Sequence, residues 1–303
     1  MGINNRNAGY IQAYNKRRLY PIVDDKLTTK QYAIDKGLAV PPLYNRISSP
    51  GQLKKLGEIL EPLDDFVVKP ANGSGGDGIL VFDDKYAGKF RTVSGKLLGL
   101  DDIHAHMIDT LSGVFSLGGQ PDSVMIEYRV KFDPVFSKIS YQGVPDVRII
   151  VFQGIPTMAM VRLPTRQSGG KANLHQSAIG AGVDVVTGKT LAGVQGNHFV
   201  TVHPDTRESI VDVQVPHWEK LLEIASGSYD LCGLGYLGVD LVLDKDMGPL
   251  ILELNARPGL NIQIANDDGL VRRLKMIENL DSLPATVAER IAFAKEHFAV
   301  AQH

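Results

Sequence analysis

Two predicted strands near the C-terminus carry three oxygen-bearing side chains that could bind a divalent cation. In the stretch GVDLVLDKDMGPLILELN, a turn is expected at residues 245–248. A hairpin symmetric about this turn places Asp240 across from Glu253, and strand alternation puts Glu253 and Asn255 on one face. Two carboxylates and an amide oxygen suit Mg²⁺, with nucleotide phosphates and water completing its octahedron.

The same three residues could instead form a solvated polar face, which antiparallel sheets often have. The flanking residues are mostly leucine and isoleucine, however, and two neighbouring carboxylates would repel each other without a cation. The pattern therefore favours a metal site formed by Asp240, Glu253 and Asn255.

A second stretch, VVKPANGSGGDGI, places Lys69 at the end of an apolar strand with a glycine-rich loop directly after it. Glycine permits positive φ and close backbone approach, so successive N–H groups can converge on an anion, and the lysine would reach the same phosphates. The stretch has neither the GK[ST] of a Walker loop nor the immediate helix of a Rossmann fingerprint. A phosphate-binding loop between two strands and an ordinary glycine-rich hairpin both fit this pattern. The candidate phosphate-binding residues are Lys69, Gly73, Ser74, Gly75, Gly76 and Gly78.

The elements that position these stretches are predicted from hydrophobic periodicity and turn residues. Helices are expected at residues 24–38, 48–60 and 217–233 and in the C-terminal segment, with an arm or short helix at 1–20. Strands are expected at 66–70, 79–82 and 123–130, and hairpins at 146–164, turned by Gln153-Gly154, and at 237–255. Residues 165–200 are expected to form long loops with short strands. Because hairpins dominate, we predict an α+β fold with mostly antiparallel sheets.

Two α+β lobes follow from this order of elements. The first covers residues 1–125, with the N-terminal arm and an insertion at about 84–120 that has an amphipathic centre. The second covers residues 126–303 and holds the metal site and the C-terminal helices.

Composition narrows the classes of protein to consider. The chain of 303 residues has a formal net charge of −2 and no long basic run, which argues against nucleic acid as the main partner. It has neither a stretch of 18 apolar residues nor an apolar segment typical of a secretory signal. Cys232 is the only cysteine, which excludes a disulfide scaffold and a cysteine-based zinc cluster. These features predict a cytoplasmic protein without a membrane span.

Taken together, the two stretches make the chain resemble the ATP-grasp superfamily, and within it the RimK-type α-L-glutamate ligases and their ligase-like relatives. The resemblance extends over residues 24–261. The matching stretches are DDKLTTKQYAIDKGLAVP, FVVKPANGSGGDGI, VMIEYRV, DVRIIVFQG, KANLHQSAIGAG, GVDLVLD and ILELNARPGLN. It implies two lobes that clasp a nucleotide.

The resemblance implies a role for several residues. Lys26 and Lys69 match the two nucleotide-binding lysines, and Glu127 matches the hinge position that holds adenine and ribose. Arg148 matches the arginine near the γ-phosphate and the acyl-phosphate. A phosphate or substrate role is implied for Arg162 and Asn173. The matched metal ligands are again Asp240, Glu253 and Asn255.

Several residues of these stretches also have a simpler interpretation. Lys26 could be a solvated helix lysine, and Arg148 and Arg162 could be surface arginines of a strand. His175 could be a catalytic base or a satisfied polar residue, and Arg257 could bind a substrate carboxylate or brace the loop after Asn255.

The activity that the resemblance implies is ATP- and Mg²⁺-dependent ligation of a carboxylate to an amine, with Mn²⁺ as an alternative metal. The expected partners are glutamate or a similar acid and an amine acceptor, which could be a peptide or protein. RimK-type ligases carry a small α/β domain before the first nucleotide lysine, whereas Lys26 is nearly N-terminal here, and NARPGL replaces their N-s-s-P-G-l. Two other functions fit the same motifs: a small-molecule kinase and a non-catalytic ATP-binding module. The oligomeric state stays open.

Overall fold

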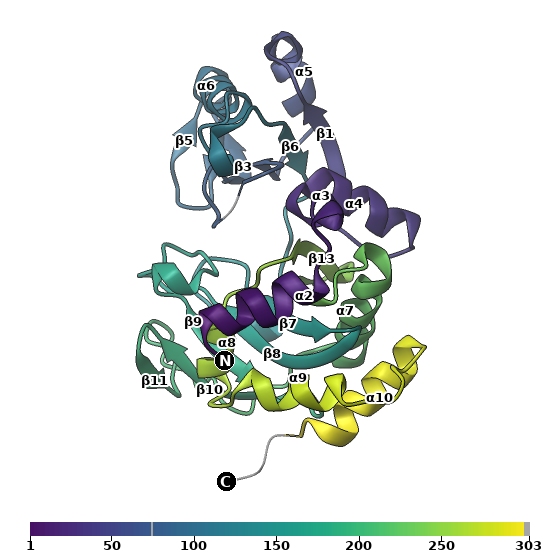
Figure 1. Ribbon diagram of the computed structural model, residues 1–303. Coiled ribbons are helices and arrows are strands. Elements are labelled where there is room, and N and C mark those ends of the chain that lie inside the picture. Colours follow the sequence, from purple (N-terminus) through teal and green to yellow (C-terminus); the bar gives the residue numbers. More distant parts are fainter. Residues whose placement is uncertain (74, 300–303) are drawn as a thin grey trace. The chain divides into compact units, whose positions relative to one another are not determined.

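The computed structural model describes residues 1–73 and 75–299, which form two compact units, each with its own antiparallel sheet (Figure 1). The first unit contains Met1–Asp24, Thr28–Val40 and the described residues from Lys131 onward. The second contains Asp25–Leu27 and Pro41–Val130. No helix among the described residues is long and apolar enough to cross a membrane.

The second unit is built on a six-stranded sheet in the order β1-β6-β2-β3-β4-β5. Its strands are β1 (Leu43–Ile47), β2 (Phe66–Pro70), β3 (Leu80–Tyr86), β4 (Lys89–Thr92), β5 (Leu97–Leu98) and β6 (Val124–Glu127). The predicted strands on both sides of the glycine loop are confirmed, since β2 pairs with β3 from Phe66–Phe82 to Val68–Leu80. Strands β4 and β5 lie within residues 84–120 and extend this sheet.

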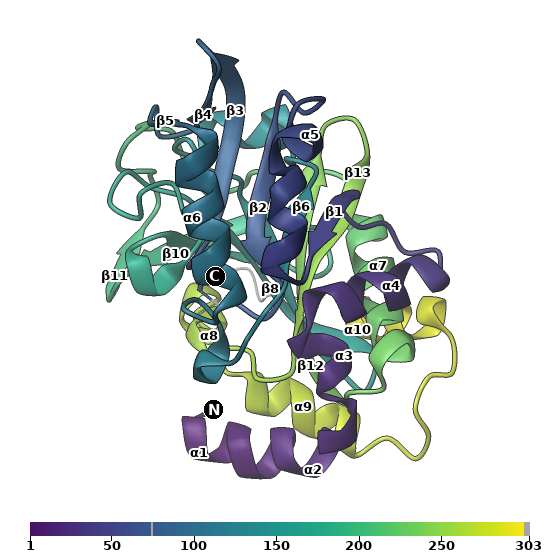
Figure 2. The same cartoon turned by 90° about the horizontal axis from the view of Figure 1, so that it is seen from above.

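Helices cover the sheet of the second unit. The predicted helix at 48–60 is a 3-10 helix, η3 (Pro50–Lys55), followed by α5 (Leu56–Leu60), with Ser49 as N-cap and Pro50 at the first position. Helix α6 (Leu100–Leu111) lies beside α5 and packs on β2, β5 and β6 (Figure 2). Its amphipathic sequence explains this placement, because Ile103 and Met107 are fully buried in the core with Phe66 and Phe82.

The first unit is built on a seven-stranded sheet in the order β11-β10-β9-β8-β7-β12-β13. Its strands are β7 (Asp146–Phe152), β8 (Ile155–Leu163), β9 (Ile179–Val183), β10 (Thr190–Gln195), β11 (His198–Val200), β12 (Tyr236–Asp244) and β13 (Gly248–Asn255). Both predicted hairpins are confirmed: Gln153 and Gly154 turn β7 into β8 with positive φ, and Asp240 pairs with Glu253 between β12 and β13. A register shift between Asp240 and Leu241 makes the second hairpin irregular.

Helices surround the sheet of the first unit. Helix α7 (Trp218–Cys232) packs on β7, β8, β12 and β13, and its apolar side is buried as its sequence predicts. Further α-helices are α3 (Pro21–Asp24), α4 (Lys26–Asp35, whose first two residues belong to the second unit), α8 (Asn261–Ala265), α9 (Leu270–Glu278) and α10 (Val287–His297).

The N-terminal arm is a helix that packs on the sheet of the first unit. It runs through α1 (Ile3–Asn5), a π-helical segment, η1 (Arg6–Ile11), and α2 (Gln12–Tyr14). Tyr10 packs edge-on against Phe152. Buried Asn15 then binds both sides of the β12–β13 hairpin, because its amide donates to Tyr236 O at 2.8 Å and Ala256 O at 3.0 Å. The arm therefore braces the loop that follows Asn255.

Candidate active site

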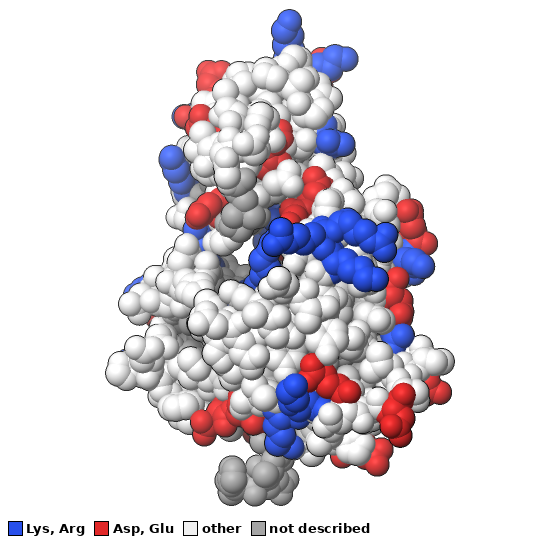
Figure 3. All heavy atoms as spheres, viewed as in Figure 1, with Lys and Arg blue, Asp and Glu red and all other residues white. Residues whose placement is uncertain are grey.

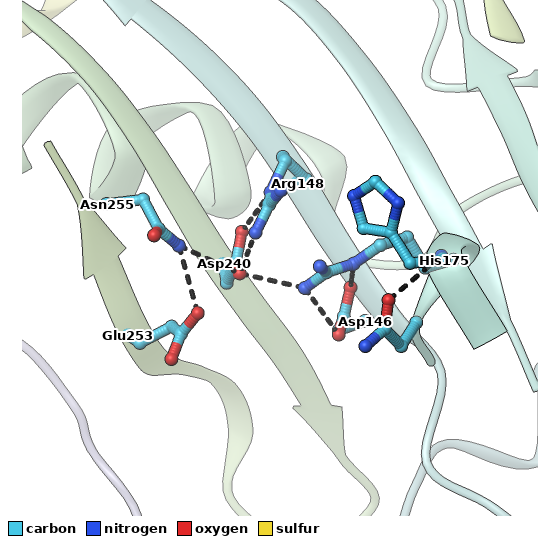
Figure 4. Close-up of polar contacts among 8 residues, drawn as sticks. Asp146, Arg148, His175, Asp240, Glu253 and Asn255 are labelled. Carbon is cyan, nitrogen blue, oxygen red and sulfur yellow. Dashed lines mark hydrogen bonds and ion pairs between the residues drawn. The ribbon is translucent and has the colours of Figure 1, made fainter. Parts of the chain in front are cut away.

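Four neighbouring strands of the first unit carry a row of charged side chains on one face (Figure 4). Backbone pairing creates the row: Arg162 of β8 lies opposite Asp146 of β7, and Arg148 of β7 lies opposite Asp240 of β12. Asp240 in turn lies opposite Glu253 of β13. Residues two apart on a strand share a face, which adds Asn255 to the row.

Two arginines converge on the carboxylate of Asp240, which is fully buried. Arg148 binds it in a bidentate manner, with Nε–Oδ1 at 2.7 Å and Nη2–Oδ2 at 2.6 Å. Arg162 Nη2 donates to the same Oδ2 at 2.8 Å and to Asp146 Oδ2 at 2.7 Å. Such charge-assisted, forked contacts fix the planes of both guanidinium groups.

The charges of this network are set by burial and by the arginines. Burial alone would raise the pKa of Asp240, but the guanidinium groups of Arg148 and Arg162 outweigh it and hold this pKa well below its usual range. At Asp146 burial dominates over the attraction of Arg162, and its pKa is raised. Asp240 therefore stays ionised at neutral pH, held by both arginines.

Glu253 and Asn255 complete the set predicted to bind a metal. Asn255 Nδ2 lies 2.9 Å from Glu253 Oε1 and 3.4 Å from Asp240 Oδ2, so the three side chains meet at one point. Among the described residues, no group of three or more His, Cys, Asp or Glu side chains could hold a metal ion, so an ion here would use the amide as well as the two carboxylates. Rotation of this amide presents its oxygen to the same point. The donor set therefore fits Mg²⁺ with its remaining ligands supplied from outside the protein.

The sequence prediction did not name Asp146 as a site residue, although this aspartate anchors Arg162. Asp146 is buried and accepts two hydrogen bonds from this guanidinium. Its position two residues before Arg148 could have indicated that it belongs to the site, because alternation along a strand puts both side chains on one face.

In the second unit, Lys69 and Glu127 lie on the neighbouring strands β2 and β6 and form an ion pair. Both side chains are buried, with exposed fractions of 6% and 3%. A buried ammonium and a buried carboxylate each need such a partner, because isolated charges are costly away from water. Lys69 is thus held at the point where β2 enters the glycine loop.

Lys26 is tied to the same loop. Its backbone N–H donates to Ala71 O at 3.1 Å, and its Nζ donates to Gly73 O at 2.6 Å. The structure therefore brings Lys26 and the glycine loop together, and Lys69 directly precedes that loop. Gly75, Gly76 and Gly78 all have positive φ, a backbone conformation that glycine adopts without steric strain. Ser74, also predicted to bind phosphate, lies outside the described residues.

Three further candidates lie in loops of the first unit. Asn173 caps a short 3-10 helix, η6 (Leu174–Gln176), where its Oδ1 accepts from the backbone N–H of His175 at 3.0 Å. His175 itself is exposed. Arg257 follows Asn255 by two residues, stacks over the ring of Tyr20 at 4.6 Å and contacts Asp24 at 3.3 Å. Its side chain is still half exposed, so part of the guanidinium remains accessible to a ligand although Arg257 also braces the loop.

These features define an ATP-grasp protein, with two antiparallel sheets and their helices as the sequence predicted. More narrowly, residues 5–279 match the family described as sugar-transfer associated ATP-grasp, and the chain belongs to that family. No curated protein matches the sequence.

The comparison with solved structures found similar chains at low sequence identity. Biotin carboxylase from Campylobacter jejuni, in complex with β,γ-ATP, has a TM-score of 0.50 and 16% identity, covering 94% of this chain and 48% of that one. D-cycloserine synthetase DcsG has a TM-score of 0.48 and 16% identity over 85% of this chain and 70% of that one. The ATP-grasp ligase PsnB, complexed with a minimal precursor, has a TM-score of 0.46 and 16% identity, covering 92% of this chain. The present chain spans 62% of the length of PsnB.

Proposed function

We propose that the protein is an ATP- and Mg²⁺-dependent ligase that joins a carboxylate to an amine. The observation that carries this proposal is the row of Arg148, Arg162, Asp240, Glu253 and Asn255 across β8, β7, β12 and β13 in a chain of the ATP-grasp family. Two fixed guanidinium groups beside a cluster of oxygen ligands suit a reaction in which a phosphoryl group is transferred.

In this proposal the second unit binds the nucleotide. Lys69, Lys26 and the backbone N–H groups of the glycine loop hold the phosphates, and Glu127 holds adenine and ribose. The positive φ values at Gly75, Gly76 and Gly78 support this role, because such a loop can direct consecutive N–H groups at an anion. Asn173 adds a contact to phosphate or substrate.

The first unit performs the chemistry. The substrate carboxylate attacks the γ-phosphorus of ATP, ADP leaves, and an acyl-phosphate forms; an amine then attacks its carbonyl carbon and releases inorganic phosphate. Arg148 and Arg162 stabilise the negative charge on the transferred phosphoryl group. Asp240, Glu253 and Asn255 would hold Mg²⁺, which would supply positive charge to offset that of the phosphates. The protein contributes mainly by positioning the reactants.

We further propose an acidic amino acid or an acidic peptide as one substrate. The resemblance to RimK-type glutamate ligases supports this class, as does the half-exposed guanidinium of Arg257 beside Asn255. The neighbouring surface is also basic: Lys16, Arg17 and Arg18 are all exposed, and Figure 3 shows Lys and Arg side chains gathered near α2 and α3. A basic surface attracts an anionic substrate over several ångströms.

Lys69→Met tests the nucleotide site. The variant should bind ATP at least about tenfold more weakly, because it removes a charge-assisted contact to phosphate. It should also lose about 3 kcal/mol of stability, because Glu127 remains as a buried carboxylate without the ammonium group of Lys69. Calorimetric titration with ATP and thermal unfolding measure the two effects.

The double variant Lys69→Met/Glu127→Gln is the matched control. It removes both buried charges, so stability should largely recover while ATP affinity stays low. ATP affinity equal to that of the wild type in both variants would remove Lys69 from the site.

A further inference from the structure

The glycine loop is held at its first residues by a carboxylate that precedes β6. Asp122 is buried; its Oδ2 accepts from the backbone N–H of Asn72 at 2.9 Å, and its Oδ1 accepts from Asn72 Nδ2 at 2.8 Å. Ser116 Oγ also donates to Asp122 Oδ2, at 2.7 Å, and Ser116 forms a backbone bridge with Gly73. Asp122 therefore links the beginning of the loop to the segment after α6.

The end of the loop is held by α6 itself. His106 Nε2 donates to Gly78 O at 2.9 Å, and the His106 ring lies 5.0 Å from the ring of Phe115. Phe115 packs on Gly78 so closely that a Cβ at this glycine would lie 2.5 Å from Phe115 Cγ. Gly78 also has a φ of 74°, so a side chain there would be strained as well as crowded.

Both attachments come from residues 100–122, which are anchored in the core of the second unit. Ile103 and Met107, on the buried face of α6, are fully buried among residues of β2, β3 and β6. A well-packed helix can hold the partners of a loop in one place at little further entropic cost, because its own side chains are already ordered.

We propose that residues 100–122 position the glycine loop for the nucleotide phosphates, with His106 and Asp122 as the positioning residues. This inference rests on the proposed function. Glycine-rich loops lose much backbone entropy when they order around a ligand, and fixing both ends in advance removes part of that loss from binding. Residues 100–120 of the insertion predicted at about 84–120 are thus assigned to the ATP site.

His106→Ala and His106→Gln test the inference as a pair. Alanine removes the donor to Gly78 O, and we expect the Kd for ATP to rise about tenfold, the usual effect of losing one useful hydrogen bond. Glutamine keeps an N–H donor, so His106→Gln should return the Kd to within about threefold of the wild type. His104→Ala is the matched control, because His104 lies exposed on the same helix and should leave the Kd unchanged.

Hydrogen exchange of the nucleotide-free protein distinguishes a local effect on the glycine loop from a change in overall stability. The backbone amides of residues 75–80 should exchange faster in His106→Ala, while those of β6 and the core of α6 should exchange as in the wild type. Asp122→Asn should have the same effect on the amides of residues 72–73, since an amide cannot accept on both sides.

The outcomes separate the inference from the proposed function. Unchanged exchange and unchanged ATP affinity in His106→Ala, or a glutamine variant as weak as the alanine variant, would overturn the positioning role while leaving the ligase proposal intact. A wild-type protein that binds no ATP would overturn the proposed function and, with it, the assignment of this segment to a nucleotide site.

Discussion

Asp240→Asn should abolish ATP turnover and lower the free energy of unfolding by about 3 kcal/mol or more. Asparagine has nearly the same shape, but it removes the negative charge that both Arg148 and Arg162 bind. Arg162 would then keep its ion pair with Asp146, whereas the mostly buried guanidinium of Arg148 would lose its ion pair with Asp240. Denaturant unfolding measures the loss of stability, and release of ADP with the best available substrate measures turnover.

Asp244→Asn provides the control for this large effect. Asp244 is also buried on β12, but it caps the hairpin turn by accepting from the backbone N–H groups of Asp246 and Met247. Its replacement should cost stability and leave turnover nearly unchanged. If Asp240→Asn were as active as Asp244→Asn, the arginine–aspartate network would have no catalytic role.

Glu253→Gln should reduce turnover by about a thousandfold or more with little change in stability, because it removes a metal-binding charge from a side chain that is only partly buried. Glutamine can keep the hydrogen bond to Asn255, whose amide lies 2.9 Å from Glu253 Oε1. Turnover at saturating Mg·ATP and thermal unfolding are the two measurements. The combination of lost activity and retained stability distinguishes Glu253 from Asp240.

Glu223→Gln is a matched control for this prediction. Glu223 lies exposed on α7, where it pairs with Lys220, so the same chemical change should leave both measurements unaffected. Near-normal ATP consumption by Glu253→Gln would show that the metal assignment is wrong.

The alignment of Asp240, Glu253 and Asn255 could be predicted because it depends on local rules. Symmetry about the expected turn at residues 245–248 pairs Asp240 with Glu253, and alternation fixes the face. In the structure Asp244 pairs with Gly248, so the turn is one residue shorter, and the register shift between Asp240 and Leu241 restores the pairing of Asp240 with Glu253. The partners of Asp240 could not be predicted in the same way, because Arg148 is 92 residues away in sequence. Such a contact depends on which strands become neighbours, and β12 has β7 as its second neighbour besides its hairpin partner β13.

The segment at 84–120 shows what a sequence pattern does not predict. Its amphipathic centre was recognised from the sequence, and the structure shows that it forms α6, but periodicity carries no information on what a helix holds in place. The contacts of His106 with Gly78 and of Asp122 with Asn72 link residues 28 and 50 positions apart. Sequence alone therefore indicated an insertion, whereas the structure shows that His106 within the segment and Asp122 just after it bind the two ends of the glycine loop.

The most direct test of the central claim follows oxygen atoms from substrate to product. The protein would be incubated with Mg·ATP and pairs of amino acids and short acidic peptides, with the carboxylate labelled with ¹⁸O, and the products analysed by mass spectrometry. An acyl-phosphate ligase must form an amide and transfer one labelled oxygen from the carboxylate to inorganic phosphate. A product that retains the phosphoryl group on a hydroxyl, or ADP and phosphate formed without any amide or label transfer, would contradict the proposed ligase function.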